Sequence, residues 1–127
     1  MRSTGQCQQA KLKAFNRCKK TGLRKDIVRD SADLEACIGD DPRGSVARIC
    51  DPVIGRLAMR VLPRKCAANG VDLSSSFPGC ATTDAEVLAA CVDEIVECRI
   101  CRALNQADDL AVDCDIFDDG EVNTSCM

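Results

Sequence analysis

The sequence contains no histidine, no tryptophan and no tyrosine, and only three phenylalanines among 127 residues. Without histidine the chain lacks the commonest general base, the usual neutral metal ligand and the CxxCH motif of covalent haem attachment. Hydrolase and zinc-enzyme functions are therefore disfavoured, and we expect no enzymatic activity. Because aromatic residues are scarce, the core must be packed from smaller aliphatic side chains, which contribute less hydrophobic free energy per residue.

Long apolar runs are also missing. No stretch approaches the roughly 20 apolar residues that a membrane-spanning helix needs, so the sequence predicts no membrane span. Residues 1–20 are polar and basic, whereas a secretory signal has an apolar middle region. Export from the cytosol is therefore predicted from the cysteines alone.

Cysteine is abundant instead. Eleven cysteines in 127 residues reach the density, about 8–10%, at which a disulfide scaffold becomes the leading explanation of a small secreted chain. The alternatives are a set of thiolates that binds soft metal ions, and free structural thiols. The candidates for disulfides are Cys7, Cys18, Cys37, Cys50, Cys66, Cys80, Cys91, Cys98, Cys101, Cys114 and Cys126. The odd count leaves one thiol, which is either buried and inert or paired with a second chain.

The segment VECRICRALN, residues 96–105, places a CxxC pair inside a predicted helix. A redox CxxC has its first thiol at a helix N-terminus, where the thiol pKa is lowered. A zinc site would need a second CxxC or a histidine pair. Because side chains at i and i+3 in mid-helix are poorly aimed for a disulfide, Cys98 and Cys101 are expected to bond to different partners. The wide spacing of the other cysteines suits links between helices.

Charge is nearly balanced at −3 overall but is divided between two halves. Residues 1–66 hold 15 Lys or Arg and 7 acidic residues, giving +8, and residues 67–127 hold 2 and 13, giving −11. Residues 11–25 carry seven cations, but the acidic half would repel a polyanion, so nucleic-acid binding is not expected. Opposite charges can instead attract within one chain or between head-to-tail copies.

End signals place the helices, and the candidate helix caps are Ser3, Gly22, Asp51, Gly70 and Thr83. Ser3 and Thr83 are each followed three residues later by Gln or Glu, which is the spacing of a capping box. Asp51 precedes a proline at the start of a helix. Pro63 is expected to kink or split that helix.

A weak internal repeat relates CKKTGL, residues 18–23, to CAANGV, residues 66–71. In each copy a glycine is expected to end a helix in the left-handed conformation and to return the next apolar residue onto the cysteine. Leu23 would then pack on Cys18, and Val71 on Cys66. The pattern reflects either a duplicated helical unit or one type of cap used twice.

The sequence thus predicts an all-α, disulfide-rich bundle of four or five short helices with an irregular acidic C-terminal tail. A single domain, residues 1–127, is expected to comprise a basic helical half (1–70), a loop (71–83), a helix (84–112) and a cross-linked acidic tail (113–127). On the last helix, Val87, Leu88, Cys91, Ile95 and Cys98 share one face, which predicts that this face points into the core.

The acidic tail is the candidate ion site. Its carboxylates offer enough oxygen ligands for Ca²⁺ if the tail curls around the ion: Asp113, Asp115, Asp118, Asp119 and Glu121. The pattern departs from the helix-loop-helix calcium loop because Phe117 stands where a carboxylate belongs. A solvated acidic turn is the alternative. A disulfide between Cys114 and Cys126 is expected to close this tail.

The stretches DLEACIGDDPRGSVARICD, GVDLSSSFPGC and ECRICRALNQADDLAVDCDIFDDGEVNTSC resemble a family of uncharacterised cysteine-rich, secreted helical proteins of deltaproteobacteria and related environmental bacteria. Their shared ending has the form CRxCxxLNxADxLxxDCDxFDDGxxNxSC. It corresponds here to Cys98, Cys101, Cys114, Asp115, Asp118, Asp119, Gly120 and Cys126. The resemblance implies export and oxidation, and names no activity.

These features favour a secreted, non-enzymatic structural or interaction module in the extracellular space, on the cell surface or in the periplasm. Its expected partner is another extracellular protein or a second copy, bound head to tail and joined in one version by an intermolecular disulfide, as in a subunit of an extracellular polymer. A calcium- or small-ligand-binding module and a cytosolic thiolate metal store are the alternatives.

Overall fold

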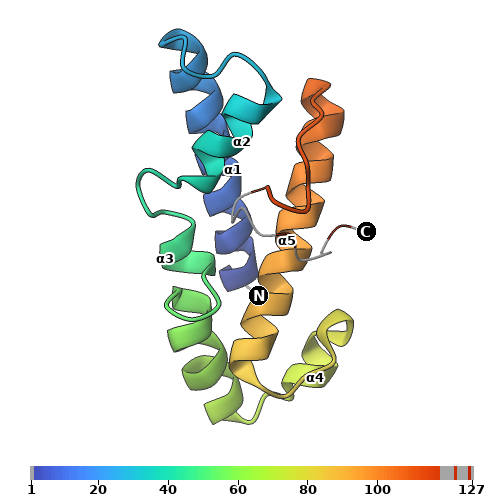
Figure 1. The fold of residues 1–127 in the computed structure, drawn as a ribbon. Coiled ribbons are helices and arrows are strands. Elements are labelled where there is room, and N and C mark those ends of the chain that lie inside the picture. Colours follow the sequence, from blue (N-terminus) through green and yellow to red (C-terminus); the bar gives the residue numbers. More distant parts are fainter. Residues whose placement is uncertain (1, 118–121, 123–125, 127) are drawn as a thin grey trace.

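The computed structural model describes residues 2–117, 122 and 126. These residues form only helices, turns and irregular segments, so the predicted all-α class is confirmed (Figure 1). The α-helices are α1 (Arg2–Arg24), α2 (Ser31–Gly39), α3 (Ala47–Cys50), α4 (Leu73–Ser76) and α5 (Ala85–Asp108). A π-helix, η1 (Leu57–Cys66), and two 3₁₀ turns, η2 (Ala67–Asn69) and η3 (Pro78–Cys80), lie between α3 and α5.

Two long helices determine the shape of the molecule. Helix α1 has 23 residues and α5 has 24, which at 1.5 Å per residue makes each about 35 Å long. Figure 1 shows α5 running the length of the molecule, beside α1 over one part and beside η1 over the other. Helix α5 is therefore the wall against which the first half of the chain packs.

The core consists of three apolar clusters arranged along these helices. One lies between α1, α2 and α5 and includes Phe15, Ile38 and Phe117. A second lies between η1, α4 and α5, and a third joins α1 to α3. Val96 of α5 packs against all three clusters, so the core continues from one cluster to the next.

Five disulfides link ten of the eleven cysteines: Cys7–Cys50, Cys18–Cys37, Cys80–Cys91, Cys98–Cys126 and Cys101–Cys114. The prediction that Cys98 and Cys101 bond to different partners is confirmed. The predicted Cys114–Cys126 bond is wrong, because each of these cysteines bonds to α5 instead. The tail is therefore fastened to the helix at two points rather than closed on itself.

The disulfides are confined to the two halves of the chain. Two of them lie within residues 7–50, and the other three lie within residues 80–126. The remaining cysteine, Cys66, is unpaired and half-buried between the two sets. No covalent link other than the backbone therefore joins the basic half to the acidic half.

Two predicted helix starts differ from the structure. Helix α1 already includes Arg2, so Ser3 lies inside the helix and is not its cap. The cap of α5 is Asp84, whose carboxylate accepts hydrogen bonds from the backbone N–H groups of Glu86 and Val87 at 2.9 Å. Thr83 is one residue too early, because the stronger acceptor, the aspartate carboxylate, occupies the next position.

The two predicted glycine caps have different outcomes. Gly70 has φ of 74°, and the N–H groups of Gly70 and Val71 bond to the carbonyls of Ala67 and Cys66 at 3.0 and 3.1 Å, which is the Schellman motif. Gly22 lies inside α1, which continues to Arg24. The packing predicted for Leu23 is wrong, because Leu23 lies inside α1 and is 59% exposed. Val71 is 41% exposed, and its contact with Cys66 stays a prediction.

Asp51 caps a turn rather than the helix itself. Its carboxylate accepts hydrogen bonds from the N–H groups of Val53 and Ile54 at 2.8 Å, and the π-helix begins only at Leu57. Pro63 lies inside this π-helix and does not split it.

After residue 70, the bounds of the secondary-structure elements differ from the predicted ones. The predicted loop 71–83 contains α4 and η3. Helix α5 ends at Asp108 instead of residue 112, because Asp109 adopts a left-handed conformation with φ of 52°. On α5, Leu88 is buried but Val87 is 56% exposed, so the buried face is rotated from the predicted one toward Ala89 and Val92.

Candidate functional site

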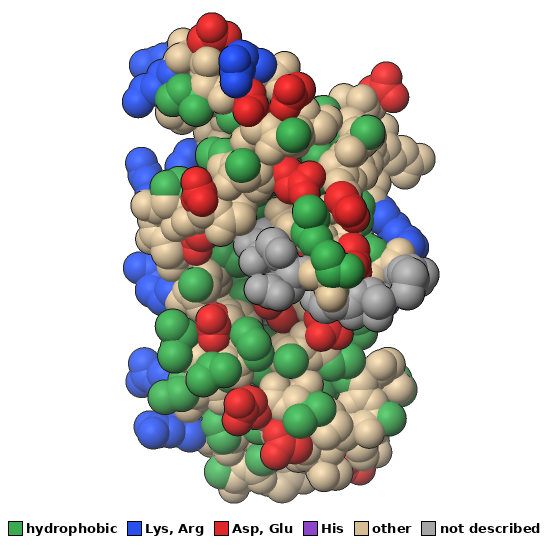
Figure 2. All heavy atoms as spheres, in the orientation of Figure 1, with side chains coloured by type: hydrophobic (Ala, Val, Ile, Leu, Met, Phe, Trp, Pro, Cys, Tyr) green, Lys and Arg blue, Asp and Glu red, His purple; other side chains and the backbone are tan. Residues whose placement is uncertain are grey.

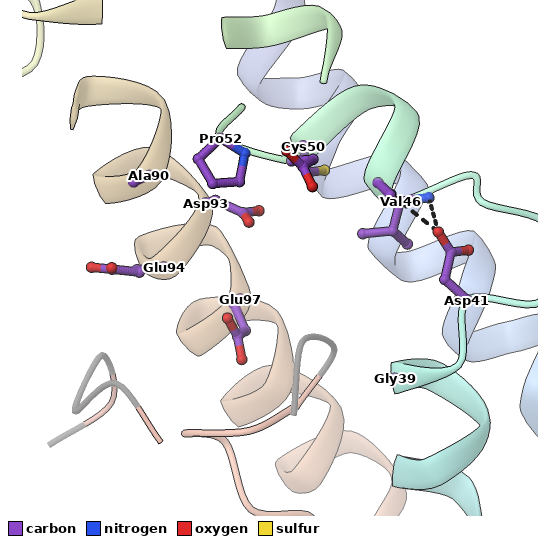
Figure 3. Close-up of a pocket in the computed structure, with 11 residues that line it drawn as sticks. Gly39, Asp41, Val46, Cys50, Pro52, Ala90, Asp93, Glu94 and Glu97 are labelled. Carbon is purple, nitrogen blue, oxygen red and sulfur yellow. Dashed lines mark hydrogen bonds between the residues drawn. The ribbon is translucent and has the colours of Figure 1, made fainter. Parts of the chain in front are cut away.

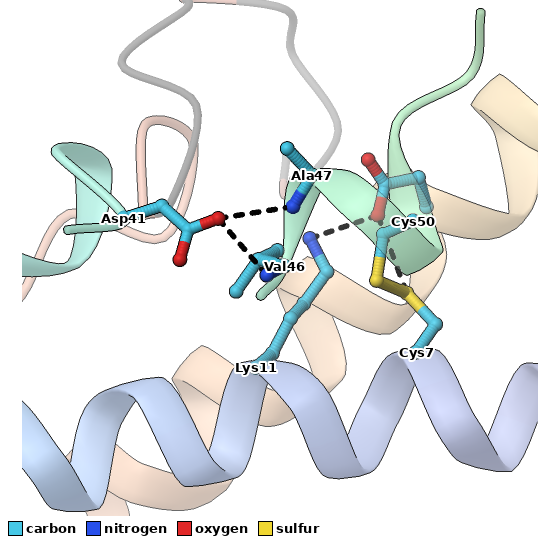
Figure 4. Close-up of polar contacts among 7 residues, drawn as sticks. Cys7, Lys11, Asp41, Val46, Ala47 and Cys50 are labelled. Atoms are coloured by element: carbon cyan, nitrogen blue, oxygen red, sulfur yellow. Dashed lines mark hydrogen bonds and ion pairs between the residues drawn. A yellow bond between two sulfur atoms is a disulfide. The ribbon is translucent and has the colours of Figure 1, made fainter. Parts of the chain in front are cut away.

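A buried ion pair joins the two halves of the chain at the centre of the molecule. The side chain of Lys11, on α1, is completely buried, and its Nζ lies 2.9 Å from Oδ1 of Asp93 on α5. The same oxygen lies 3.5 Å from Sγ of Cys7, in the Cys7–Cys50 disulfide. Figure 4 shows Lys11 pointing from α1 toward this disulfide. A charge can be buried in this way only when it is paired and hydrogen-bonded.

Helix α5 carries another carboxylate near this pair, and that carboxylate is buried. Glu97 is 1% exposed and lies one helical turn after Asp93. The sequence patterns did not single out these buried charges, although the spacing of the residues is informative. Lys11 shares a helix face with Cys7 and Cys18, and Glu97 shares one with Cys101, so each charge falls on a buried stripe.

A cleft of about 360 Å³ opens beside the ion pair, between α5 and the segment 39–52 that contains α3. Figure 3 shows Asp93 projecting from α5 toward Pro52 and Cys50, whereas Glu94 points away from the segment that holds Asp41 and Val46. Five carboxylates contribute to its lining: Asp41, Asp51, Asp93, Glu94 and Glu97. Val46, Pro52 and Ala90 supply apolar surface. The cleft is thus suited to a cationic side chain with an apolar stem.

Three of the five carboxylates also hold the walls of the cleft in place. Asp41 accepts hydrogen bonds from the N–H groups of Ser45, Val46 and Ala47 at 2.9–3.0 Å and so fixes the start of α3. Asp51 caps the following turn, and Asp93 pairs with Lys11. Glu94 has no hydrogen bond or ion pair with any described residue and is therefore the side chain best placed to contact a partner.

Cys7, Cys50 and Asp93 bring their potential ligand atoms within 4.8 Å of one another. The two sulfur atoms are joined in a disulfide, so they offer no thiolate to a metal ion. The ammonium group of Lys11 already supplies a positive charge at the carboxylate. We assign this group a structural role.

A basic stripe lies on another face of the molecule. We define it as Lys13, Arg17, Lys20 and Arg24 of α1 together with Arg56, Arg60 and Arg64 beside and within η1. At 100° per residue the four positions on α1 fall within about 60° of one another. None of the seven cations has an ion pair with a described residue, and Arg17 is the only one that is not fully exposed. Figure 2 shows Lys and Arg gathered along the edge that α1 and η1 form.

Apolar side chains are exposed near one end of the cleft. Val53 and Ile54, which follow Pro52 of the cleft lining, are 59% and 70% exposed. Val87, three residues before Ala90 on α5, is 56% exposed. Figure 2 shows hydrophobic and acidic side chains interspersed on this face. Exposed apolar side chains next to charged ones are a feature of surfaces that bind other proteins.

The predicted calcium ligands are only partly described. Asp113 is exposed, and its Oδ1 accepts a hydrogen bond from the N–H of Asp115 at 3.0 Å. Asp118, Asp119 and Glu121 lie outside the described residues. Phe117, which interrupts the acidic run, is completely buried in the cluster between α1, α2 and α5. Its burial anchors the chain up to that residue, and calcium binding remains a hypothesis.

Two surface carboxylates have perturbed acidities. Hydrogen bonds from the hydroxyl groups of Ser75 and Ser74 hold the pKa of Asp72, the cap of α4, below its usual value. A hydrogen bond from the guanidinium group of Arg29 likewise lowers the pKa of Asp33 in α2. Both groups stabilise local turns, and neither lines the cleft.

Fold and disulfides together define the class of protein: an all-α chain in which five disulfides indicate an oxidising, non-cytosolic location. None of its described helices has the length and hydropathy required to cross a membrane. Comparison of the chain with protein-family models, with curated proteins and with solved structures found no match.

Proposed function

We propose that the chain is a secreted, non-enzymatic structural module that assembles with further copies through its charged faces. The observation that carries this proposal is the presence, on one disulfide-stabilised body, of an unpaired basic stripe and an acidic cleft. Contact between the stripe of one copy and the cleft of the next is heterologous, and such contacts propagate into open chains when the rotation between copies does not close. The proposed location is the extracellular space, the cell surface or the periplasm.

Internal pairing leaves these faces available. Lys11 and Lys19 of α1 pair with Asp93 and Asp108 of α5, so part of the opposite charge of the two halves is neutralised inside the chain. The seven cations of the basic stripe and the carboxylate of Glu94 remain outside these pairs. Rim charges of this kind mainly set orientation and association rate, and the apolar margin of the cleft supplies the area to be buried.

Sedimentation of the oxidised protein at low and high salt tests the proposal. We expect species larger than the monomer at low ionic strength and monomer at about 0.5 M NaCl, where charges separated by more than a few ångströms are screened. Reversing either face, by Glu94→Lys or by Arg60→Glu with Arg64→Glu, is expected to abolish association. Monomer at every salt and protein concentration would contradict the proposal.

A mixture of the two reversed variants identifies head-to-tail geometry. Each variant keeps one intact face, and the two reversed faces are themselves opposite in charge. The mixture is therefore expected to recover the association that neither variant shows alone. Glu35→Lys matches the charge change of Glu94→Lys, and Arg43→Glu with Arg99→Glu matches that of the double stripe variant. These changes lie outside the cleft lining and the basic stripe, and both controls are expected to assemble like the wild type. Equal loss of assembly in these controls would mean that net charge, and not the two faces, governs association.

A further inference from the structure

The disulfides divide the molecule into two covalent units, which we name the basic unit (residues 1–66) and the acidic unit (residues 67–127). In the basic unit the Cys18–Cys37 bond is nested inside Cys7–Cys50, and in the acidic unit Cys101–Cys114 is nested inside Cys98–Cys126. No disulfide crosses from one unit to the other. Each unit therefore keeps its own disulfides when the contacts between the units are broken.

Two of the three apolar clusters lie across the boundary between the units, and the third lies mainly within the basic unit. Phe15 and Ile38 of the basic unit pack with Ile100 and Phe117 of the acidic unit in one cluster. Leu57 and Leu62 of η1 pack with Leu88 and Val92 of α5 in another. The buried Lys11–Asp93 ion pair lies across the same boundary. Each unit consequently needs the other kind of unit as a partner in order to bury its apolar face.

The connection between the units is short and exposed. All six residues 67–72 are exposed, and they contain a 3₁₀ turn and the left-handed Gly70. Straightening this turn breaks the bonds of the Schellman motif and those that the Asn69 side chain donates to the carbonyls of Arg64 and Lys65, all of them local. Six extended residues span about 20 Å, enough to pass the acidic unit to a neighbouring molecule.

We propose that two copies of this chain exchange units, so that the basic unit of one copy packs against the acidic unit of the other. The exchanged interface contains the contacts already present in the monomer, so no new surface is required. Exchange goes beyond the assembly proposed above, because it uses the core and not the basic stripe. A short linker gives the attached unit an effective concentration on the order of mM, so exchange is expected where many chains fold close together.

Complementary charge reversals across the buried pair test this inference. In Lys11→Asp alone and in Asp93→Lys alone, every pairing of units, internal or exchanged, buries two like charges. When the two variants are refolded together under oxidising conditions, exchange places opposite charges in both interfaces. We expect the mixture to give at least tenfold more soluble oxidised protein than either variant alone, as a heterodimer of two 13.6 kDa chains detected by native mass spectrometry.

The double variant Lys11→Asp with Asp93→Lys is the control, because it restores the pair within one chain and is expected to fold as a monomer. A mixture that gives no more soluble protein than its components, while the double variant folds, would overturn the inference. If the single variants fold unaided, wild-type chains of two isotopic masses decide the question. Dimers containing both masses are expected after refolding together at about 1 mM, and monomer alone would overturn the inference.

Salt separates this inference from the proposed function. Exchanged dimers are held by a core interface and are expected to persist in about 0.5 M NaCl, where stripe-to-cleft contacts are screened. Reversal of Glu94 or of the basic stripe is expected to leave exchange unchanged. Assembly that is lost in salt, without any heterodimer in the charge-reversal mixture, would support the proposed function and reject exchange.

Discussion

At the scale of single residues, two side chains that look ordinary in the sequence have large structural effects. Lys11 is one of seven cations between residues 11 and 25, yet it alone among them is completely buried. Gly22 resembles a helix terminator, yet it lies within α1 where the returning chain packs against the helix. In both cases the surroundings of the residue, and not its type, determine its contribution to stability.

Replacing Asp93 with asparagine removes the negative charge that faces the buried ammonium group of Lys11. We expect the free energy of unfolding of the oxidised protein to fall by about 2–3 kcal/mol, since hydrogen bonds to buried charged groups are worth about that much. Denaturation by guanidinium chloride measures the change. Glu94→Gln, one position along α5, is the matched control and is expected to change stability by less than about 0.5 kcal/mol. Similar losses in both variants would contradict the assigned role of Asp93.

Replacing Gly22 with alanine introduces a methyl group that collides with Val28. The added Cβ would lie 2.6 Å from Cβ of Val28, and such overpacking typically destabilises a protein by about 1–3 kcal/mol. Gly5→Ala, in the same helix, is the control, because no atom lies within 4 Å of the new methyl group. It is expected to stabilise the protein by about 0.5–1 kcal/mol. Thermal unfolding of both variants checks that they change stability in opposite directions.

At the scale of secondary-structure elements, aspartate side chains determine where four of the α-helices begin. Asp30, Asp72 and Asp84 accept backbone hydrogen bonds at the starts of α2, α4 and α5. Asp41, six residues before α3 begins, accepts a hydrogen bond from the N–H of Ala47, the first residue of that helix. Carboxylates near a helix N-terminus also interact favourably with the helix dipole. The elements therefore depend on these side chains being ionised.

This dependence has a predicted direction with pH. Because the pKa of Asp72 is lowered in the folded state, its cap stabilises α4 fully above the pKa of the unfolded chain, near pH 4. The stabilisation is lost as the pH falls through the lower folded value. NMR titration of the Asp72 carboxyl group should give a pKa below the usual range. Ser74→Ala with Ser75→Ala removes the two hydroxyl donors and should raise that pKa, and an unchanged pKa would contradict the assigned cause.

At the scale of the whole molecule, the disulfides stabilise each unit but leave the boundary between the units to packing. Inserting a protease site into the exposed segment 67–72 tests this arrangement. After cleavage without reductant, we expect two fragments on a denaturing gel and a single species in native gel filtration. Fragments that stay linked on the denaturing gel would mean that a disulfide crosses the boundary.

The control for this cleavage is a site inserted between residues 24 and 27, inside the loop that Cys18–Cys37 closes. The backbone there is equally exposed, but the fragments are expected to remain joined on the denaturing gel until reductant is added. Two disulfides, Cys18–Cys37 and Cys7–Cys50, join these fragments, so separation without reductant would contradict both bonds.

The sequence by itself determined the fold class, the use of most cysteines in disulfides and the separation of opposite charges between the halves. These properties follow from composition and local periodicity, because cysteine density, capping residues and charge are properties of short segments. The left-handed Gly70 and the Schellman bonds around it could be predicted for the same reason.

Only the tertiary structure decided which cysteines pair, which face of α5 is buried and where the charges meet. Cys114 and Cys126 are near each other in the sequence, but they bond to Cys101 and Cys98 of α5. The acidic cleft likewise combines residues from α5 with residues from the segment 39–52. Such contacts join positions that are far apart in the sequence, and local patterns contain no information about which distant segments become neighbours when the core is packed.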